Sequence, residues 1–81
     1  MTIRNNQELE LFEETIDRCS HTIWLISPLG KQYDLKNPIE RYLGIAELLK
    51  SNEAEEPELF TSCIEDEMNI FDFLSAQRAF A

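Results

Sequence analysis

The chain has 81 residues and a mass of 9.5 kDa, the size of one small domain (residues 1–81) with a single modest core. Its 7 basic and 16 acidic residues give a formal net charge of −9, which excludes a nucleic-acid binder that works through a basic face. The longest apolar run, Ile23 to Ile26, is far shorter than the roughly 20 residues that a membrane span needs, and the sequence has no recognisable secretion leader. We therefore expect a cytoplasmic protein that binds neither nucleic acid nor membrane directly.

Helical spacing predicts an amphipathic helix of about 12 to 14 residues after a flexible segment, residues 1–5. Asn5 and Glu8 have the spacing of a capping box, in which the two side chains satisfy backbone N–H groups at the helix start. The apolar residues that recur on one face of this helix are Leu9, Phe12, Ile16 and Cys19. Ser20 and His21 are typical of the turn that ends it.

A β-hairpin is expected next. Residues 22–27 are rich in β-branched and aromatic side chains, and residues 32–36 alternate between polar and apolar. Between them, Pro28 fixes φ and Gly30 permits a positive φ. Two strands joined by so short a connection pair in the antiparallel direction.

Asn37, Pro38 and Glu40 form the clearest local signal in the chain: an N-cap, a first-turn proline and a capping-box acid. They predict a helix that runs to about Lys50. We expect its inward face to consist of Ile39, Leu43, Ala46 and Leu49, with Tyr42, Ile45 and Leu48 beside them. Gly44 costs roughly 1 kcal/mol relative to Ala in a helix interior, so its presence indicates close packing at that position.

The last third of the chain is expected to contain an acidic loop (residues 51–57), a short strand (58–62) and a helix (65–77) that Ser62 and Glu65 would cap. The apolar residues of this helix are Met68, Ile70, Phe71, Phe73 and Leu74. The predicted fold class is therefore α+β, an open-faced sandwich of order α-β-β-α-β-α. Its three-stranded antiparallel sheet carries the helices on one face.

This pattern resembles the histidine-containing phosphocarrier protein, HPr, of the bacterial sugar phosphotransferase system. The first helix leads into a strand at Thr22-Ile23-Trp24-Leu25. A turn at Gly30-Lys31 followed by Tyr33-Asp34-Leu35-Lys36-Asn37 is similar to the family's G-K-x-V-N-L-K-S. The family's A-D-E and apolar pairs are matched by Glu65-Asp66-Glu67 and Ile70-Phe71-Asp72-Phe73-Leu74. The resemblance covers residues 10–77 and implies an HPr-like sandwich.

The resemblance also implies that the chain is chemically silent. The family's phosphorylatable histidine corresponds to the stretch Arg4-Asn5-Asn6-Gln7, where no side chain can hold a phosphoryl group as imidazole does. The family's regulatory serine falls on Asn37, which has no hydroxyl. His21 lies at the opposite, negative end of the first helix, which repels a phosphate. We therefore predict no catalytic residue and no enzyme activity.

The cysteine and histidine content predicts no metal site and no cofactor. Cys19 and Cys63 are far apart in the sequence and lack a C-x-x-C motif, which indicates free thiols in a reducing compartment. A disulfide between them requires Cα atoms within roughly 7 Å, which the sequence leaves open. One histidine and two scattered cysteines do not make a four-ligand zinc site.

The hairpin predicts an apolar surface. If Ile23 and Leu25 point toward the helices, the two-residue period of a strand turns Trp24 and Ile26 to the other, open face. The third strand adds Leu59 or Phe60 to the same side, because parity alone does not decide between them; Phe60 is the candidate. Alternatively, the N-terminal segment or Phe80 folds over this face.

An uncovered face of this kind leads to our first hypothesis, a small non-catalytic interaction or regulatory module that binds a partner protein or a second copy of itself. By resemblance, Ile39 and Tyr42 would add a second contact patch, because the second helix carries the docking surface in the HPr family.

The charge favours an alternative hypothesis, an acidic inhibitor of the phage anti-restriction or anti-CRISPR type. Such a protein would occupy the basic, nucleic-acid-binding surface of a target, and its capture would be fast and sensitive to salt. The candidate acidic surface consists of Glu53, Glu55, Glu56, Glu65, Asp66 and Glu67.

Overall fold

The computed structural model describes residues 2–51 and 55–79, and within them the predicted order α-β-β-α-β-α is confirmed. The elements are α1 (Asn6–Arg18), β1 (Trp24–Ile26), β2 (Gln32–Asp34), α2 (Pro38–Lys50), β3 (Glu58–Phe60) and α3 (Ile64–Ala79). None of the helices in these two ranges is both long enough and apolar enough to cross a membrane.

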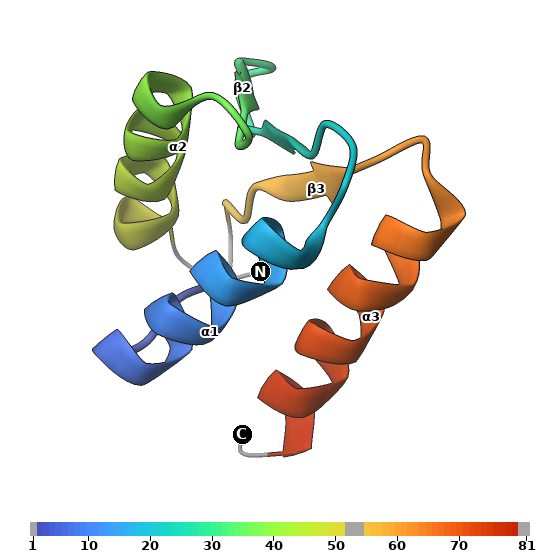
Figure 1. Ribbon diagram of the computed structural model, residues 1–81. Helices are drawn as coiled ribbons and strands as arrows, with labels where there is room; N and C mark the ends of the chain where they lie inside the picture. The colour runs from blue at the N-terminus through green and yellow to red at the C-terminus, as the bar shows by residue number, and fades with distance from the viewer. Residues whose placement is uncertain (1, 52–54, 80–81) are drawn as a thin grey trace.

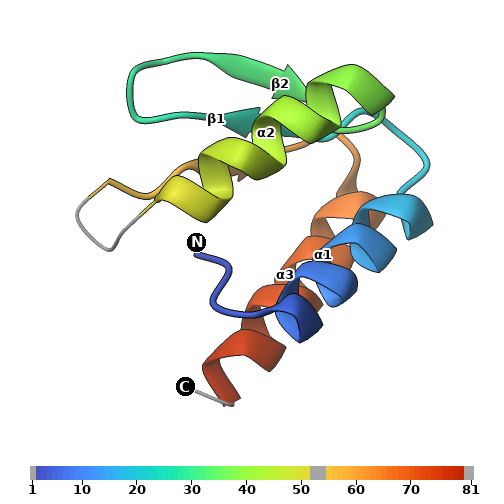
Figure 2. The same cartoon turned by 90° about the vertical axis from the view of Figure 1, so that its left-hand side faces the viewer.

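The three strands form one antiparallel sheet in the order β2-β1-β3, so β1 lies at its centre. Figures 1 and 2 show the sheet on one side of the molecule and the three helices on the other. α1 packs along α3, whereas α2 packs against β2. The strands are shorter than predicted, but the hairpin continues beyond them, because Leu35 N–H donates to Ile23 O at 2.9 Å. Gly30 in the connecting turn has a φ of +88°, as expected.

Asn5 is the N-cap of α1 as predicted, but the reciprocal bond of the capping box goes to Arg4 instead of Asn5. Asn5 Oδ1 accepts the Glu8 N–H at 2.9 Å, and the Glu8 carboxylate accepts the Arg4 N–H at 2.8 Å, one residue before the cap. The segment expected to be flexible makes further contacts. Ile3 packs against the core, and Thr2 O accepts a hydrogen bond from Gln77 Nε2. Figure 2 shows the N-terminus on the helix side of the sheet, so this segment does not cover the outward sheet face.

The core lies between the sheet and the helices. Its most deeply buried apolar side chains, each less than 2% exposed, are Phe12, Ile16, Ile23, Leu25, Leu35 and Leu48. Phe12 of α1 meets Phe73 of α3 edge-to-face, with ring centroids 5.7 Å apart. Burial of Ile23 and Leu25 is the alternation that the sequence predicted for the first strand.

The orientation of α2 differs from the prediction. Asn37 Oδ1 caps the helix by accepting the N–H groups of Ile39 and Glu40, as expected. However, Gly44 and Leu48 face the sheet, and the residues predicted to be inward are exposed or half-buried. The exposed members of that set are Ile39, Leu43 and Leu49, and Ala46 is half-buried. A Cβ on Gly44 would lie 3.0 Å from Leu35 Cδ2, so the close helix–sheet contact selects the glycine face.

The last helix begins one residue earlier than predicted. Cys63, not Ser62, directly precedes α3, and Cys63 O accepts the Glu67 N–H at 2.9 Å. The inward apolar side chains of α3 are Ile70, Phe73 and Leu74. Phe80 lies outside the described residues.

Candidate functional site

The outward sheet face brings the predicted residues Trp24, Ile26 and Phe60 together. Trp24 is paired with Phe60 across β1 and β3, and Ile26 is paired with Glu58. Phe60 is 55% exposed, whereas Leu59 packs against the core, which decides the parity that the sequence left open. Trp24 and Ile26 are half-buried, because neighbouring strands flank a central strand on both sides.

Polar side chains border this apolar group. Asp34 lies opposite Trp24 on β2, and Gln32 lies opposite Ile26. Glu58 lies on the β3 side of Ile26 and is exposed. The outward sheet face is therefore an apolar centre with a carboxylate on each side.

The second predicted patch, Ile39 and Tyr42, lies on the outward face of α2. Ile39 is 74% exposed and Tyr42 is 76% exposed. The same face includes Leu43 and Leu49, which are also exposed. Helical periodicity predicted that Ile39, Leu43 and Leu49 lie in the core, but all three lie on the surface.

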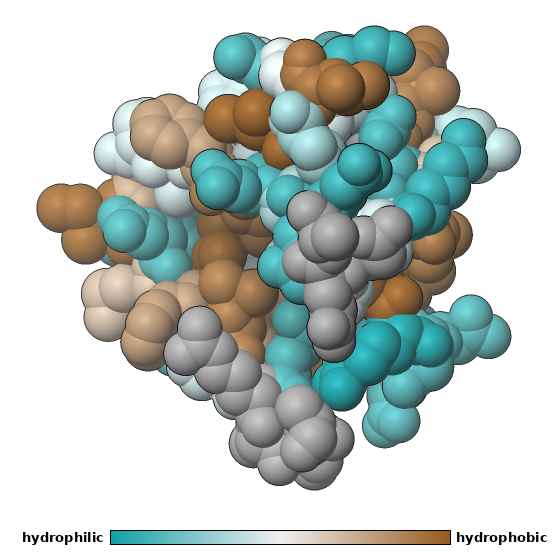
Figure 3. Space-filling model, turned by 180° about the vertical axis from the view of Figure 1, so that it is seen from behind, coloured by the Kyte–Doolittle hydropathy of each residue, from teal (hydrophilic) through white to brown (hydrophobic). Residues whose placement is uncertain are grey.

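A third apolar surface lies on α3, and sequence reasoning missed it. Ile64, Met68 and Phe71 are more than 60% exposed and recur at the i, i+4, i+7 spacing of one helix face. Figure 3 shows apolar surface gathered along the α3 side of the molecule, on the left of that view. The spacing was readable in the sequence, but it did not separate this face from the inward one, because α3 carries apolar residues on both.

The candidate acidic surface is only partly assembled. Glu55, Glu56, Glu65 and Glu67 are exposed, whereas Glu53 lies outside the described residues. The structure removes Asp66 from this surface, because Asp66 is 1% exposed. A position in the first turn of a helix predicted a solvated carboxylate, and the tertiary contacts of Asp66 override that prediction.

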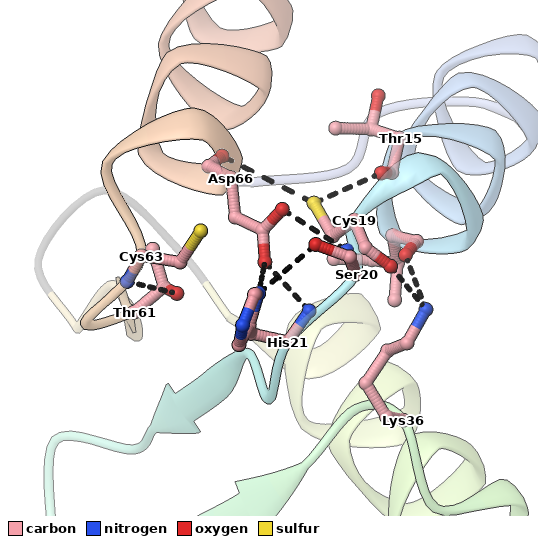
Figure 4. Close-up of polar contacts among 9 residues, drawn as sticks. Thr15, Cys19, Ser20, His21, Lys36, Thr61, Cys63 and Asp66 are labelled. Atoms are coloured by element: carbon pink, nitrogen blue, oxygen red, sulfur yellow. Dashed lines mark hydrogen bonds and ion pairs between the residues drawn. The ribbon is translucent and has the colours of Figure 1, made fainter.

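Asp66 instead holds the end of α1 and the start of β1 against α3. Its Oδ1 accepts the Ser20 N–H at 3.0 Å, and its Oδ2 accepts the His21 N–H at 2.8 Å (Figure 4). Burial by itself raises the pKa of the Asp66 carboxyl, but these two hydrogen bonds and the nearby charges of His21 and Lys36 outweigh it. The pKa of Asp66 is therefore lowered from its ordinary value.

Lys36 forms hydrogen bonds with backbone carbonyl groups at the end of α1. Its Nζ donates to Ile16 O at 3.0 Å and to Cys19 O at 2.7 Å, which are carbonyl groups at the end of α1. A cation at a helix C-terminus also interacts favourably with the helix dipole. The α1–β1 connection is thus held by a carboxylate from α3 and an ammonium from the β2–α2 connection.

His21 and Cys63 lie beside the Asp66 carboxylate. One donor atom each of His21, Cys63 and Asp66 lie within 4.8 Å of one another. His21 Nδ1 is 2.9 Å from Ser20 Oγ and 3.6 Å from Asp66 Oδ2. We call these three residues the HCD cluster. In the part of the chain that the structure describes, no hydrogen bond joins the Cys63 thiol to His21, so the nucleophile–base contact of a catalytic triad is missing.

Cys19 belongs to the core rather than to this cluster. Its thiol is buried and donates to Thr15 O at 3.2 Å. Burial, together with the nearby Asp66 charge, raises the pKa of the Cys19 thiol. Cys19 and Cys63 are both free thiols.

A groove of about 360 Å³ lies between the start of α1 and the end of α3. Phe73 and Leu11 contribute to its apolar lining. Its charged side chains, Arg4 and Glu8, are joined by a 2.7 Å ion pair, so each already neutralises the other. This groove therefore offers a ligand apolar contact but little unsatisfied charge.

Comparison with protein-family models, curated proteins and solved structures found no match. The resemblance to HPr therefore stays a prediction from the sequence pattern.

Proposed function

We propose that this chain is a small non-catalytic module that binds a partner protein through the outward sheet face, Trp24, Ile26 and Phe60. The observation that carries the proposal is the register that places the exposed Phe60 ring directly opposite Trp24. Aromatic side chains offer a large contact area and lose little conformational entropy on binding, which is why they are enriched at interfaces.

The charges favour a partner whose contact surface combines apolar and basic side chains. Asp34 and Glu58 border the apolar centre, and the chain as a whole carries a net charge of −9. A second copy would bring the same carboxylates and the same net charge against this face, which repulsion opposes. Lysine or arginine side chains around an apolar anchor complement both features.

Trp24 provides a direct measurement, because it is the only tryptophan in the chain. The probe is an amphipathic peptide built of lysine and leucine, titrated against the protein while the emission of Trp24 is followed. We expect a saturable change in emission with an affinity that falls as salt is added. Phe60→Asp should weaken binding by about tenfold or more while it leaves the reporter in place.

Met68→Asp is the matched control, because it also places an acid at an exposed apolar position, but on α3. Binding should survive this change. If Met68→Asp abolishes binding and Phe60→Asp does not, the contact lies on α3 and the proposal fails. The molar mass of the free protein completes the test. A dimer that Phe60→Asp dissociates would make a second copy the occupant and overturn the basic partner.

The acidic-inhibitor alternative has narrower support. The exposed residues of the candidate acidic surface come from two separate segments of the chain: Glu55 and Glu56, and Glu65 and Glu67. Asp66 is buried. It predicts binding that is lost in high salt and is unaffected by Phe60→Asp. The same titration therefore separates the two functions.

A further inference from the structure

We propose that the HCD cluster, His21, Cys63 and Asp66, is a zinc-binding site in which water completes the coordination. The three residues contribute an imidazole nitrogen, a sulfur and a carboxylate oxygen, all within 4.8 Å of one another. This combination of donors is typical of Zn²⁺, whereas Ca²⁺ and Mg²⁺ prefer sites made only of oxygen. Neither the predicted function nor the resemblance to HPr involves this site.

The dimensions fit zinc after a small closure. Zn²⁺ forms bonds of about 2.0–2.3 Å, so ligands around one ion lie about 3.5 Å apart. His21 Nδ1 already lies 3.6 Å from Asp66 Oδ2. The His21 side chain is 65% exposed and Cys63 is half-buried, so both have room to rotate toward the ion and toward water.

The backbone positions of the three residues are fixed before any ion binds. His21 N–H and Ser20 N–H donate to the Asp66 carboxylate, and each oxygen keeps a lone pair for a metal. Cys63 N–H donates to Thr61 Oγ1 at 3.2 Å (Figure 4). Cys63 O accepts the Glu67 N–H. His21 therefore comes from the α1–β1 connection, Cys63 from the β3–α3 connection and Asp66 from the first turn of α3, and the protein already holds these three segments together.

Binding has a defined proton balance. The Cys63 thiol must lose its proton to solvent when sulfur coordinates Zn²⁺, whereas His21 binds as the neutral imidazole and Asp66 as the carboxylate. Zinc affinity should therefore rise with pH. The bound ion would join the end of α1 to the start of α3 and so stabilise the folded state by mass action.

The experiment uses the full chain without a histidine tag and titrates Co²⁺ and Zn²⁺. Co²⁺ should produce a thiolate charge-transfer band, which Zn²⁺ then displaces at one equivalent. Cys63→Ser should abolish the band, and His21→Ala should weaken zinc affinity by about tenfold or more. Asp66 is left unchanged, because its removal would also break the two backbone hydrogen bonds.

Cys19→Ser is the matched control, because it removes the other thiol of the chain, which lies outside the cluster. If this variant folds poorly, Cys19→Ala replaces it. The band should survive in the control, and Zn²⁺ should raise the melting temperature of wild type and control but not of Cys63→Ser. Absence of a thiolate band in the wild type would overturn the proposal. Equal zinc affinity in the wild type and in the Cys63→Ser/His21→Ala double variant would do the same.

Discussion

Single carboxylates in this chain have roles that differ from those that their sequence positions suggest. Glu8 was expected to complete a capping box by accepting the Asn5 N–H; Asn5 Oδ1 does accept the Glu8 N–H, but the Glu8 carboxylate accepts the Arg4 N–H instead. Asp66 has an equally local explanation, an acid in the first turn of a helix, yet it is buried and binds Ser20 and His21. Local patterns predict bonds between near neighbours. They cannot predict that a residue 45 positions away supplies the N–H group.

The HCD cluster was hidden from sequence analysis for the same reason. Cys63 and Asp66 are three residues apart, but four elements, β1, β2, α2 and β3, separate them from His21, so the three residues have no recognisable metal-binding spacing. The antiparallel pairing of β1 with β3 and the packing of α1 along α3 bring His21 to Cys63. Counting histidine and cysteine therefore excluded a site that the tertiary structure makes available.

The Arg4–Glu8 pair gives a prediction about pH. The hydrogen bond from the Arg4 side chain holds the pKa of Glu8 below its ordinary value, and burial acts in the opposite direction. The unfolded chain therefore takes up a proton at Glu8 near pH 4.3, before the folded protein does. The stabilisation is complete above about pH 5 and is lost as the pH falls through the folded pKa.

Glu8→Gln should therefore unfold more easily than the wild type at pH 7, and the difference should shrink near pH 3. Denaturant unfolding at both pH values measures this. Glu10→Gln is the control, because Glu10 is an exposed acid of the same helix. A difference between wild type and Glu8→Gln that is the same at both pH values would contradict the assignment.

At the level of elements, helices and strands were predictable and their orientation was not. Asn37 and Pro38 placed the start of α2 correctly, because caps act within one turn. The apolar residues of α2 surround most of the helix, so periodicity did not select one inward face. Gly44 and Leu48, one turn apart, identify the face of α2 that contacts the sheet.

Gly44→Ala should lower the free energy of unfolding by about 1 kcal/mol, although alanine favours helices. A Cβ at this position would lie 3.0 Å from Leu35 Cδ2, 3.2 Å from Leu25 Cδ2 and 3.3 Å from Tyr33 Cβ. Overpacking of about 1–3 kcal/mol therefore exceeds the gain in propensity of about 1 kcal/mol. Denaturant unfolding measures the result.

A double-mutant cycle with Leu35→Val tests the cause. Removal of one methylene from Leu35 should cost less in the Gly44→Ala background than in the wild type, because it relieves the contact. Additive effects of the two substitutions would show that steric contact with Leu35 is not the source.

For the whole molecule, the excess of acidic residues sets the response to salt. The chain has 16 acidic and 7 basic residues, so even complete pairing of the basic residues leaves an excess of nine carboxylates. Among the described residues, Arg4–Glu8 and Arg41–Asp17 form ion pairs. Repulsion among the remaining carboxylates opposes the folded state. Added salt screens this repulsion more than it weakens two partly exposed pairs.

Raising NaCl from about 0.02 to about 0.5 M should therefore increase the melting temperature by about 3–5 °C. Circular dichroism measures the change. Glu65→Gln/Glu67→Gln removes two exposed carboxylates and should show a smaller increase. A melting temperature that falls with salt would mean that the ion pairs outweigh the repulsion.

Hydrogen bonds join the segments near the two described ends of the chain: Gln77 Nε2 donates to Thr2 O at 3.0 Å, and Arg4 Nη2 donates to Gln77 O at 3.4 Å. A short glycine-rich bridge could therefore link tail to head, and the backbone could be cut instead at the hairpin turn, where Leu29 is 90% exposed. Such a circular permutant should reach the same architecture. The fold would then depend less on the order in which segments leave the ribosome than on the surfaces that they bury.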